Sequence, residues 1–403
     1  MLYFTKAKEN CTGCSACYAV CPVQCITMVR DIKGFMYPTA DMLKCIHCRK
    51  CEKVCPVIHD ERGVVPISRQ FAVAAVSKNQ KVWEDSSSGG AFTEICKIFS
   101  DNSEAVVFGA EMQFPTVHHV GVDLQDIQRL RRSKYVQSEM GNCFIEAKDA
   151  LEQGKRVIFV GTPCQVAGFR SYLDHDYKNL LCIDFICHGV GSPTVFEDCM
   201  RYEGEKAGSS VVDYKFRNKK SCLGNYQRHT SLLVYSNGRS RYIEMDAYNR
   251  LFLNQLCLRD CCGETCKFRK IQRSGDITIA DFNNKEQVYP DLNDNRAYST
   301  IIFNTEKGKE LSEKLENNMI ILPCDIQNIV RFNPLFCRST PSNQKRKDFF
   351  DEYCKGKMIE ELIECYVPSK KTPGYWRRFV PWKLKHKVYQ SLVRMKRYMC
   401  IDE

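Results

Sequence analysis

Two cysteine runs near the start of the chain share one spacing. They read Cys11-Thr-Gly-Cys14-Ser-Ala-Cys17-Tyr-Ala-Val-Cys21-Pro22 and Cys45-Ile-His-Cys48-Arg-Lys-Cys51-Glu-Lys-Val-Cys55-Pro56. Both have the form C-x2-C-x2-C-x3-C-P, which is the spacing of bacterial segments that hold two 4Fe–4S clusters. The doubled run therefore predicts a segment that carries single electrons.

In runs of this form, the first three cysteines bind one cluster and the fourth binds the other. The expected ligand sets are Cys11, Cys14, Cys17 and Cys55 for one cluster, and Cys45, Cys48, Cys51 and Cys21 for the second. Two zinc sites or a set of disulfides are the alternative, but zinc takes four ligands per site and has no use for a proline after the fourth. Cys25 is expected to pack as a small apolar residue.

Composition favours a multidomain cytoplasmic protein. The 403 residues suffice for two or three domains, and 44% of them are hydrophobic. Residues 1–10 have no apolar segment typical of a secretory signal, and the 25 cysteines group in metal-ligand spacings. Both features favour a reducing compartment. No apolar run approaches the ~18 residues of a membrane span.

The net charge of +11 is concentrated in a basic tail. No acidic residue lies between Glu364 and Asp402, and this stretch contains the basic residues Lys370, Lys371, Arg377, Arg378, Lys383, Lys385, Lys387, Arg394, Lys396 and Arg397. The rest of the chain is close to neutral, so nucleic acid is not an expected partner of the body.

The tail has the pattern of an amphipathic helix that starts near Pro381. Its apolar face would comprise Leu384, Val388, Leu392, Met395 and Met399, after the aromatic residues Trp376, Phe379 and Trp382. Peripheral contact with an anionic inner membrane face is one interpretation. Docking of the helix on the protein's own body is the other.

We expect five segments along the chain. They are a two-cluster ferredoxin domain over 1–60, a linker over 61–70, an α/β region over 71–190, a region with further cysteines over 191–340, and a helical basic tail over 341–403. Apolar spacing predicts strands over 71–76, 105–110, 156–160 and 180–186, and helices over 91–99, 141–151 and 166–173. From residue 210 the pattern is richer in strands, with a hairpin turn at Asn237-Gly238.

Two loops have the features of anion-binding turns. They are Ser86, Ser87, Ser88, Gly89 and Gly90, and Gly161, Thr162, Pro163, Cys164 and Gln165. Glycines admit an anion close to the backbone, hydroxyls donate to it, and a following helix N-terminus favours negative charge. An ordinary helix cap is the alternative for each loop. Two such loops beside an electron-transfer module favour a phosphate-bearing redox cofactor. Lys134 and Tyr135 would contribute a cation and an aromatic ring to its site. Their alternative role is in a solvated basic stretch.

Another group of cysteines lies far along the chain from the first two runs. Cys257, Cys261, Cys262 and Cys266 share one loop, and Cys187 ends a predicted strand before His188. The preferred ligand set for a third 4Fe–4S cluster is Cys187, Cys257, Cys262 and Cys266, with Cys261 as a substitute. Zinc or metal-free thiols are the alternatives.

The order of these segments resembles a known family. Ser86–Gly90 is followed by Lys134-Tyr135-Val136-Gln137-Ser138, Gly161–Gln165, Cys187-His188-Gly189, Cys257-Leu258-Arg259 and Asp276-Ile277-Thr278-Ile279-Ala280-Asp281-Phe282. This order resembles the family of coenzyme F420 (deazaflavin) hydrogenase/dehydrogenase beta subunits, preceded by a fused ferredoxin domain. Members commonly have Gly-Asp-Phe/Tyr-Trp-Gly where this chain has Ala280-Asp281-Phe282-Asn283-Asn284, and C-x2-C where it has Cys262-x3-Cys266.

The resemblance implies an α+β multidomain protein, in which a bacterial ferredoxin-type domain precedes an α/β domain of the flavin-binding type with an additional β-rich segment. It implies FAD, iron–sulfur clusters and two-electron redox chemistry. The implied flavin contacts are Ser86 to Gly90, Lys134, Tyr135 and Gly161 to Gln165. A flavin exchanges electrons in pairs, whereas clusters pass them singly. A protein with both can therefore convert two-electron transfer into one-electron transfer, or the reverse.

The expected function is that of an oxidoreductase. Electrons would pass between an external carrier or redox partner protein and a small-molecule or lipid-linked substrate, and many members look associated with cell-surface polysaccharide synthesis. A non-catalytic electron-transfer component or adaptor of a larger redox complex is the alternative. His188 is a candidate catalytic residue, although it could simply orient its loop. Cys164 is either a reactive or a buried inert thiol.

Overall fold

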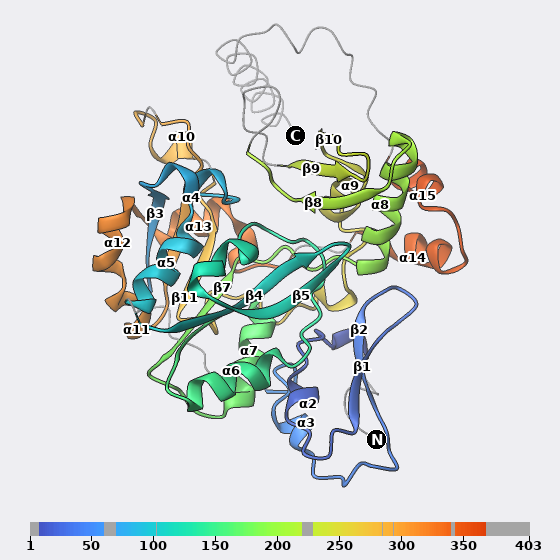
Figure 1. Cartoon of the computed structure of the whole chain (residues 1–403), viewed down its shortest axis with the longest axis horizontal. Coiled ribbons are helices and arrows are strands. Elements are labelled where there is room, and N and C mark those ends of the chain that lie inside the picture. The colour runs from blue at the N-terminus through green and yellow to red at the C-terminus, as the bar shows by residue number, and fades with distance from the viewer. Residues whose placement is uncertain are drawn as a thin grey trace, which may run out of the picture.

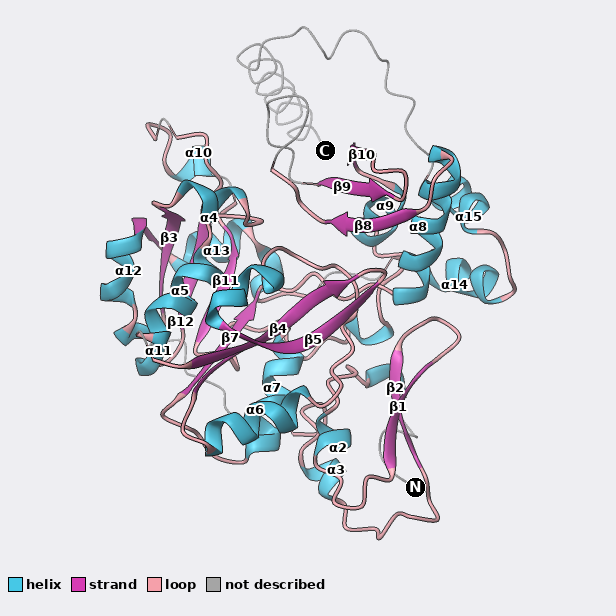
Figure 2. Ribbon diagram, viewed as in Figure 1, coloured by secondary structure: helices cyan, strands magenta, loops and turns pink. Residues whose placement is uncertain are grey.

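The computed structural model describes residues 8–59, 70–101, 103–219, 229–283, 285–292, 294–339 and 343–367. The expected linker over 61–70 is described only at Gln70, and the basic stretch from residue 368 lies outside these ranges, so the expectations about both stay predictions. The described chain forms a two-stranded, an eight-stranded and a three-stranded sheet (Figures 1 and 2). No helix in these ranges is long and apolar enough to cross a membrane.

The two cysteine runs fold together as one small unit, drawn in blue in Figure 1. Its elements are η1 (Lys8–Asn10), α2 (Ala16–Ala19), β1 (Ile26–Arg30), β2 (Met36–Ala40) and α3 (Lys50–Lys53). Each short helix follows a left-handed residue, Ser15 or Arg49, and carries the third cysteine of its run. The antiparallel β1–β2 hairpin separates the two runs.

The large sheet has the strand order β13-β3-β12-β11-β7-β6-β4-β5. Its strands are β3 (Phe71–Ser77), β4 (Ala105–Gln113), β5 (Thr116–Asp123), β6 (Arg156–Val160), β7 (Leu180–Phe185), β11 (Ile277–Asp281), β12 (Ser299–Phe303) and β13 (Met319–Cys324). β4, β6, β7 and β11 pair in parallel, and β12 is antiparallel to both β11 and β3. β3 therefore runs parallel to that group, and the carboxyl ends of five strands lie at one edge.

Helices cover both faces of this sheet. They are α4 (Gln80–Glu84), α5 (Ala91–Ser100), η3 (Leu124–Leu130), α6 (Cys143–Glu152), α7 (Pro163–Leu173), α10 (Lys285–Val288), α11 (Glu306–Glu310), α12 (Ser312–Asn318), α13 (Ile326–Phe332) and η5 (Pro334–Phe336). In β6, Ile158 packs into the core that contains α5 and α12, whereas Val157 and Phe159 pack with α6 and α7. This period-two alternation explains the fully apolar strand, because both of its faces are buried.

A small lobe lies beside the sheet (Figures 1 and 2). It comprises α8 (Pro193–Ala207), β8 (Val211–Lys215), β9 (Thr230–Tyr235), β10 (Ser240–Glu244), α9 (Ala247–Leu253), η4 (Asp260–Cys262), α14 (Arg346–Cys354) and α15 (Ile359–Tyr366). One apolar core joins these helices and strands, and Phe35 and Tyr37 of the ferredoxin unit pack into it.

Two of the expected segment boundaries are therefore wrong. The division at residue 190 does not separate two sheets, because β11, β12 and β13 complete the sheet begun by β3 to β7. The division at residue 340 assigns α14 and α15 to a tail, although Phe349, Phe350 and Leu362 are buried in the core of the small lobe. β5, β13 and α8 are further elements that the sequence patterns did not predict.

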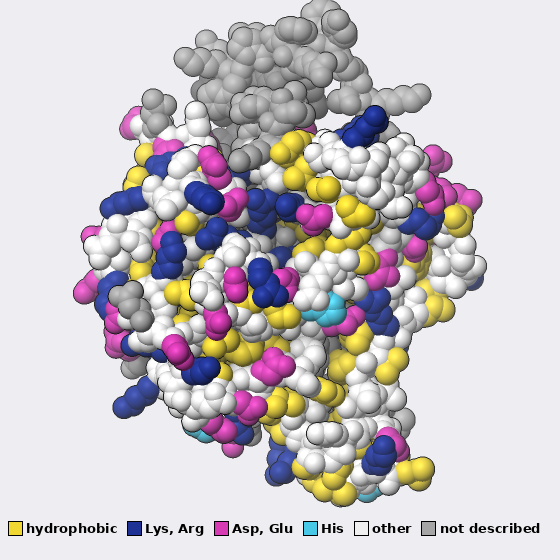
Figure 3. Space-filling view, viewed as in Figure 1, with side chains coloured by type: hydrophobic (Ala, Val, Ile, Leu, Met, Phe, Trp, Pro, Cys, Tyr) yellow, Lys and Arg dark blue, Asp and Glu magenta, His cyan; other side chains and the backbone are white. Residues whose placement is uncertain are grey.

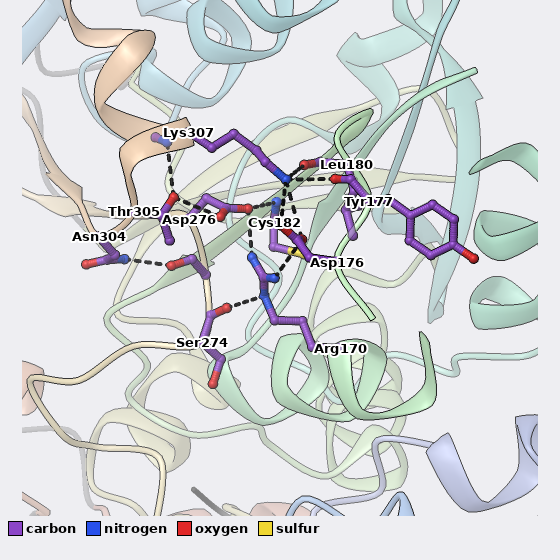
Figure 4. Close-up of polar contacts among 12 residues, drawn as sticks. Arg170, Asp176, Tyr177, Leu180, Cys182, Ser274, Asp276, Asn304, Thr305 and Lys307 are labelled. Carbon is purple, nitrogen blue, oxygen red and sulfur yellow. Dashed lines mark hydrogen bonds and ion pairs between the residues drawn. The ribbon is translucent and has the colours of Figure 1, made fainter. Parts of the chain in front are cut away.

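A buried polar network fastens α7 to the opposite edge of the large sheet, away from the carboxyl ends (Figure 4). Arg170 pairs with Asp276 at 2.8 Å and donates from Nε to Ser274 O at 2.6 Å. Asp276 also accepts hydrogen bonds from Cys182 N and Thr305 Oγ1. This network holds α7 in register with β7 and β11, so it positions the loop at the start of α7.

Candidate iron–sulfur and cofactor site

Ligands from both cysteine runs meet at one cavity in the ferredoxin unit. The cavity has a volume of about 30 Å³, and its lining includes Cys11, Cys14, Cys17, Cys51 and Cys55. Burial, followed by the charge of Cys55, raises the pKa of the Cys14 thiol to about 12. Thiols of both runs line this cavity, which fits the donor set of a 4Fe–4S cluster, and the assignment of Cys11, Cys14, Cys17 and Cys55 as its ligands stays a prediction.

Three of the four expected ligands of the second set lie in one apolar cluster. Cys21, Cys25, Cys45 and Cys51 belong to one apolar cluster with Ile26, while Cys48 is exposed. The Sγ atoms of Cys21 and Cys25 are 3.4 Å apart, and Cys25 is buried, as expected for an apolar role. Among the described residues, no group of three or more His, Cys, Asp or Glu side chains converges on the position of one metal ion.

The third group of thiols differs from the preferred set. Cys164 lies close to Cys187, Cys262 and Cys266, and after burial the charges of these three raise its pKa. The pKa of Cys187 is raised to about 12, first by burial and then by Cys262 and Cys266. Cys261 shares a hydrogen bond with Cys262, which lowers the pKa of Cys262 to about 6. Cys164, Cys187, Cys262 and Cys266, with Cys261 alongside, therefore form a fourfold thiol group.

The surroundings of Cys257 do not favour its predicted place in this group. Cys257 is fully buried in the core of the small lobe, where its neighbours are Cys199 and Tyr248. Cys257 O accepts a hydrogen bond from Ser192 N at 2.8 Å, so this residue anchors the start of α8. Cys164 lies beside the other three thiols, because Thr162 caps α7 and sets Cys164 in the first helical turn.

The first and third thiol groups are contiguous in space. Cys55, Cys164 and Cys266 pack against one apolar cluster that contains Val57 and Phe268. A Cβ atom on Gly168 of α7 would lie 2.9 Å from Cys14 Sγ, so the helix backbone approaches the ligand loop closely. Figure 1 shows α7 beside α2 and α3 of the ferredoxin unit. The ferredoxin unit thus abuts the carboxyl edge of the large sheet.

The hydroxyls of the Ser86–Gly90 loop are engaged by the protein itself. Ser88 Oγ donates to Tyr298 O at 2.7 Å, and Ser87 Oγ accepts from Ser133 N at 2.9 Å. Gly89 is required by packing, because a Cβ there would lie 2.5 Å from Ser299 N. Of the two interpretations of this loop, its contacts therefore favour a structural turn, and its role as a direct phosphate cradle stays a prediction.

Lys134 lines a basic cavity, which we define by Asp85, Met112, Gln128, Arg129, Arg131, Arg132, Ser133, Lys134, Asp213, Tyr214, Lys215 and Phe216. Its volume is about 280 Å³. Figure 3 shows Lys and Arg side chains gathered where the surface is hollowed beside the small lobe. Burial lowers the pKa of Lys134 to about 7. Five cations against two carboxylates make this cavity suited to an anion.

Tyr135 does not face that cavity. Its ring stacks on Phe252 with centroids 4.7 Å apart and contacts Phe216 edge-on at 5.2 Å. Tyr135 O accepts a hydrogen bond from Tyr248 Oη at 2.9 Å. These contacts place Tyr135 in the packing between the sheet edge and the small lobe, so the implied contact of its ring with a flavin is not supported by the geometry.

Gln165 and His188 occupy the same edge. Gln165 Nε2 donates to Ser138 Oγ at 3.0 Å, and the ring of His119 also contacts Ser138 Oγ, at 3.3 Å. Ser138 and His119 line a second cavity, of about 590 Å³, between the ferredoxin hairpin and β5. Burial and then Arg269 lower the pKa of His188, and its buried Nε2 has no hydrogen-bond partner among the described residues.

Three polar residues at this edge had no role in the sequence-based expectations. Arg217, on the small lobe, pairs with Asp281 at 2.8 Å and donates to Ser87 O. Arg269 donates to His188 O at 2.6 Å and to Cys262 O at 2.7 Å. Arg259 donates to Cys11 O at 2.8 Å. Isolated arginines carry no distinctive spacing, so only the folded structure reveals that they converge here.

Comparison with known proteins matches two regions of the chain. Residues 10–58 match the 4Fe–4S dicluster domain, and residues 154–328 match the family described as the C terminus of the coenzyme F420 hydrogenase/dehydrogenase beta subunit. The chain is 25% identical over 324 residues to the coenzyme F420-dependent sulfite reductase of Methanocaldococcus jannaschii, a match that covers 76% of this chain and 46% of that protein.

Two further similarities cover different parts of the chain. The F component of the F(420)H(2) dehydrogenase of Methanosarcina mazei is 24% identical over 48% of this chain and 59% of its own length. A protein of the F420-reducing nickel–iron hydrogenase complex from Methanosarcina barkeri, at 13% identity, covers 75% of this chain and 92% of its own, with a TM-score of 0.44.

The chain spans about half the length of the curated relatives it matches, 46% and 59% respectively. Both relatives are named as redox enzymes or their subunits. Together with the thiol geometry, the two family matches assign the chain. It contains an N-terminal 4Fe–4S dicluster domain, and its residues 154–328 belong to the family of coenzyme F420 hydrogenase/dehydrogenase beta subunits.

Proposed function

We propose that this chain is an oxidoreductase that passes electrons between an external carrier and an organic substrate through two ferredoxin clusters, a third 4Fe–4S cluster and FAD. The contiguity of Cys55, Cys164 and Cys266 carries the proposal. It connects the ferredoxin unit to a thiol group at the carboxyl edge of the sheet. Ligands of open α/β sheets bind outside the carboxyl ends of the strands.

The proposed third ligand set is Cys164, Cys187, Cys262 and Cys266. Cys164 lies in the first turn of α7, which follows β6, and Cys187 follows β7. Cys262 ends η4, and Cys266 follows it. Burial raises the pKa of Cys266, and the charge of Arg269 counteracts part of that rise, so a buried cation favours the thiolate form. Cys261 hydrogen-bonds Cys262 and would orient it without being a ligand.

The basic cavity is the proposed seat of the phosphate groups of FAD. Arg131, Arg132 and Lys134 line it, and Arg132 Nη1 is buried without a hydrogen-bond partner among the described residues. The Ser86–Gly90 loop would hold the cavity wall in place, because Ser133, which lines the cavity, donates hydrogen bonds to Ser87. When bound, the flavin would exchange electron pairs with the substrate and single electrons with a cluster. His188, which is held neutral by burial, could hold or move a proton at Nε2.

Anaerobic purification followed by iron, sulfide and cofactor analysis tests the proposal. Three clusters require about twelve irons per chain, and two require about eight, at four per cube. The released organic cofactor should be FAD, identified by mass and absorption spectrum. If reconstitution with FAD leaves no flavin bound, the oxidoreductase assignment fails. The chain would then be a non-catalytic electron-transfer component or adaptor, which is the second candidate function.

We also propose candidates for the external carrier and for the substrate. The named activities of the relatives make reduced coenzyme F420 the first carrier to assay, beside a redox partner protein. A small-molecule or lipid-linked substrate of cell-surface polysaccharide synthesis stays a prediction. So does peripheral contact of the basic tail with the inner membrane face, since the tail lies outside the described residues.

A further inference from the structure

A fully buried guanidinium lies between the first and third thiol groups. Arg259 is 1% exposed. Its Nε donates to Cys11 O at 2.8 Å, and its Nη1 donates to Met36 O at 2.9 Å and to Gln137 Oε1 at 3.3 Å. The ring of Tyr37 covers it at 3.9 Å. Nη2 has no hydrogen-bond partner in the described part of the chain.

This cation has no carboxylate partner among the residues that the structure describes. The adjacent carboxylate, Asp260, pairs instead with Arg346 at 2.6 Å and Lys33 at 3.3 Å. Burial lowers the pKa of Arg259, but charges at Cys11, Tyr37, Cys261 and Cys262 outweigh burial and raise the pKa. A buried and unpaired charge is strongly destabilising, so Arg259 requires a neighbouring anion. Iron–sulfur cubes held by four thiolates are net anions, and two of those neighbours, Cys11 and Cys262, are proposed ligands.

The ligand loop is shaped to admit this side chain. Gly13, between Cys11 and Cys14, has a left-handed φ of 69°. A Cβ at Gly13 would lie 2.5 Å from Gln137 Nε2 and 3.1 Å from Arg259 Nη1. Glycine at this position therefore lets the Arg259–Gln137 pair approach the loop that holds the first cluster.

We propose that Arg259 is a positioning residue that sets the reduction potentials of the first ferredoxin cluster and the third cluster. Its effect on the third cluster rests on the proposed function, whereas its effect on the first does not. Each cluster gains one negative charge on reduction, and a nearby fixed cation stabilises the reduced form more than the oxidised form. Arg259 thereby raises both potentials together and keeps electron exchange between the two clusters favourable.

The test is a redox titration of anaerobic holoprotein, followed by electron paramagnetic resonance. Arg259→Gln removes the charge and should shift the reduction equilibrium of the first cluster about tenfold toward the oxidised form, equivalent to about 59 mV for a one-electron couple. Arg259→Lys keeps the charge and should retain most of the wild-type potential. Gln137→Glu leaves Arg259 in place but adds a counter-charge 3.3 Å from Nη1, and should also lower the potential.

Arg170→Gln is the matched control. Arg170 is also largely buried, but it pairs with Asp276 and Asp176, and no expected ligand belongs to its network (Figure 4). This variant should lose stability without a change in the potential of the first cluster, which is the potential compared between the variants, because its network reaches the third group through the start of α7. Unchanged potentials in Arg259→Gln and Gln137→Glu would overturn the proposal, as would an equal fall in Arg259→Lys. If Arg259→Gln does not fold, Gln137→Glu decides. About eight irons in the wild type would instead contradict the third cluster, and the first-cluster potential would still test Arg259.

Discussion

Arg217 forms an ion pair with Asp281, with 2.8 Å between Nη1 and Oδ2. Arg217 follows β8 of the small lobe and Asp281 ends β11, so the pair joins the lobe to the carboxyl edge of the large sheet. Arg217 also donates to Ser87 O at 2.9 Å. The pair therefore fixes the distance between the Ser86–Gly90 loop and the lobe, where the basic cavity is formed.

Asp281→Asn should lower the free energy of unfolding by about 2 kcal/mol. The Arg217 side chain is only 7% exposed, so the substitution would leave it as a buried cation. The expected loss is smaller than that for a fully buried ion pair, because the Asp281 side chain is 21% exposed. Denaturant unfolding measures the change. Asp213→Asn breaks an exposed pair with Lys215 and should change stability by less than about 0.5 kcal/mol. Equal stability of Asp281→Asn and wild type would show that the pair does not fasten the lobe.

Cys164→Ser and Cys257→Ser should differ in iron content. Cys164 lies among the thiols of the third group, so its loss should reduce about twelve irons per chain to about eight. Cys257 is buried beside Cys199 and Tyr248, so its serine variant should lose stability and keep all its iron. Iron and acid-labile sulfide analysis of anaerobic protein decides between them. The reverse result would restore the ligand set expected from the sequence.

The sequence predicted the sites whose chemistry depends on local spacing. The doubled cysteine run predicts that Cys55 crosses to the first run, and the cavity lined by Cys11, Cys14 and Cys17 also has Cys55 in its lining. Apolar strands such as Arg156–Val160 were also recognisable, because a strand buried on both faces reads as a continuous hydrophobic run. Both predictions rely on residues that are neighbours along the chain.

Long-range pairing was not predictable in the same way. Cys257 and Cys262 are near in sequence, but η4 begins between them, and only Cys257 belongs to the buried core of the small lobe. Cys164 joins the third thiol group only because β6 pairs in parallel with β7, which brings both carboxyl ends together. The partners of Arg259 and Arg217 depend likewise on strand order, which no local pattern encodes.

Binding of an anion in the basic cavity should weaken as the pH rises above 7. Burial lowers the pKa of Lys134 to about 7, below the 10.5 of an exposed lysine. Between these values the unfolded chain binds more protons than the folded protein, so the contribution of Lys134 to stability improves with rising pH, while the cation that an anion needs is lost. The dissociation constant of FAD, the proposed occupant of the cavity, should rise by at most about tenfold per pH unit for this one proton when it is measured from pH 6 to 9.

Lys134→Met should bind FAD more weakly at pH 6 and show a flatter pH profile. A residual slope is expected from Lys219, whose pKa burial also lowers to about 7 and whose Nζ contacts Ser88 O. Lys78→Met is the control, because Lys78 donates to Glu316 O on the surface, away from the cavity. A full pH slope in Lys134→Met would assign the titration to another group.

Gly89→Ala distinguishes a structural turn from an anion cradle. A Cβ at Gly89 would lie 2.5 Å from Ser299 N and closer still to Ala75 O, and both are backbone atoms of strands that cannot yield cheaply. The variant should therefore lose about 1–3 kcal/mol of stability even without FAD. Ser88→Ala removes only the hydrogen bond to Tyr298 O and should cost about 1 kcal/mol. Thermal unfolding with and without FAD measures both. In a cofactor cradle, Gly89→Ala and the wild type would unfold at the same temperature when FAD is absent and at different temperatures when FAD is present. That result would show that packing against Ala75 and Ser299 is not what requires the glycine.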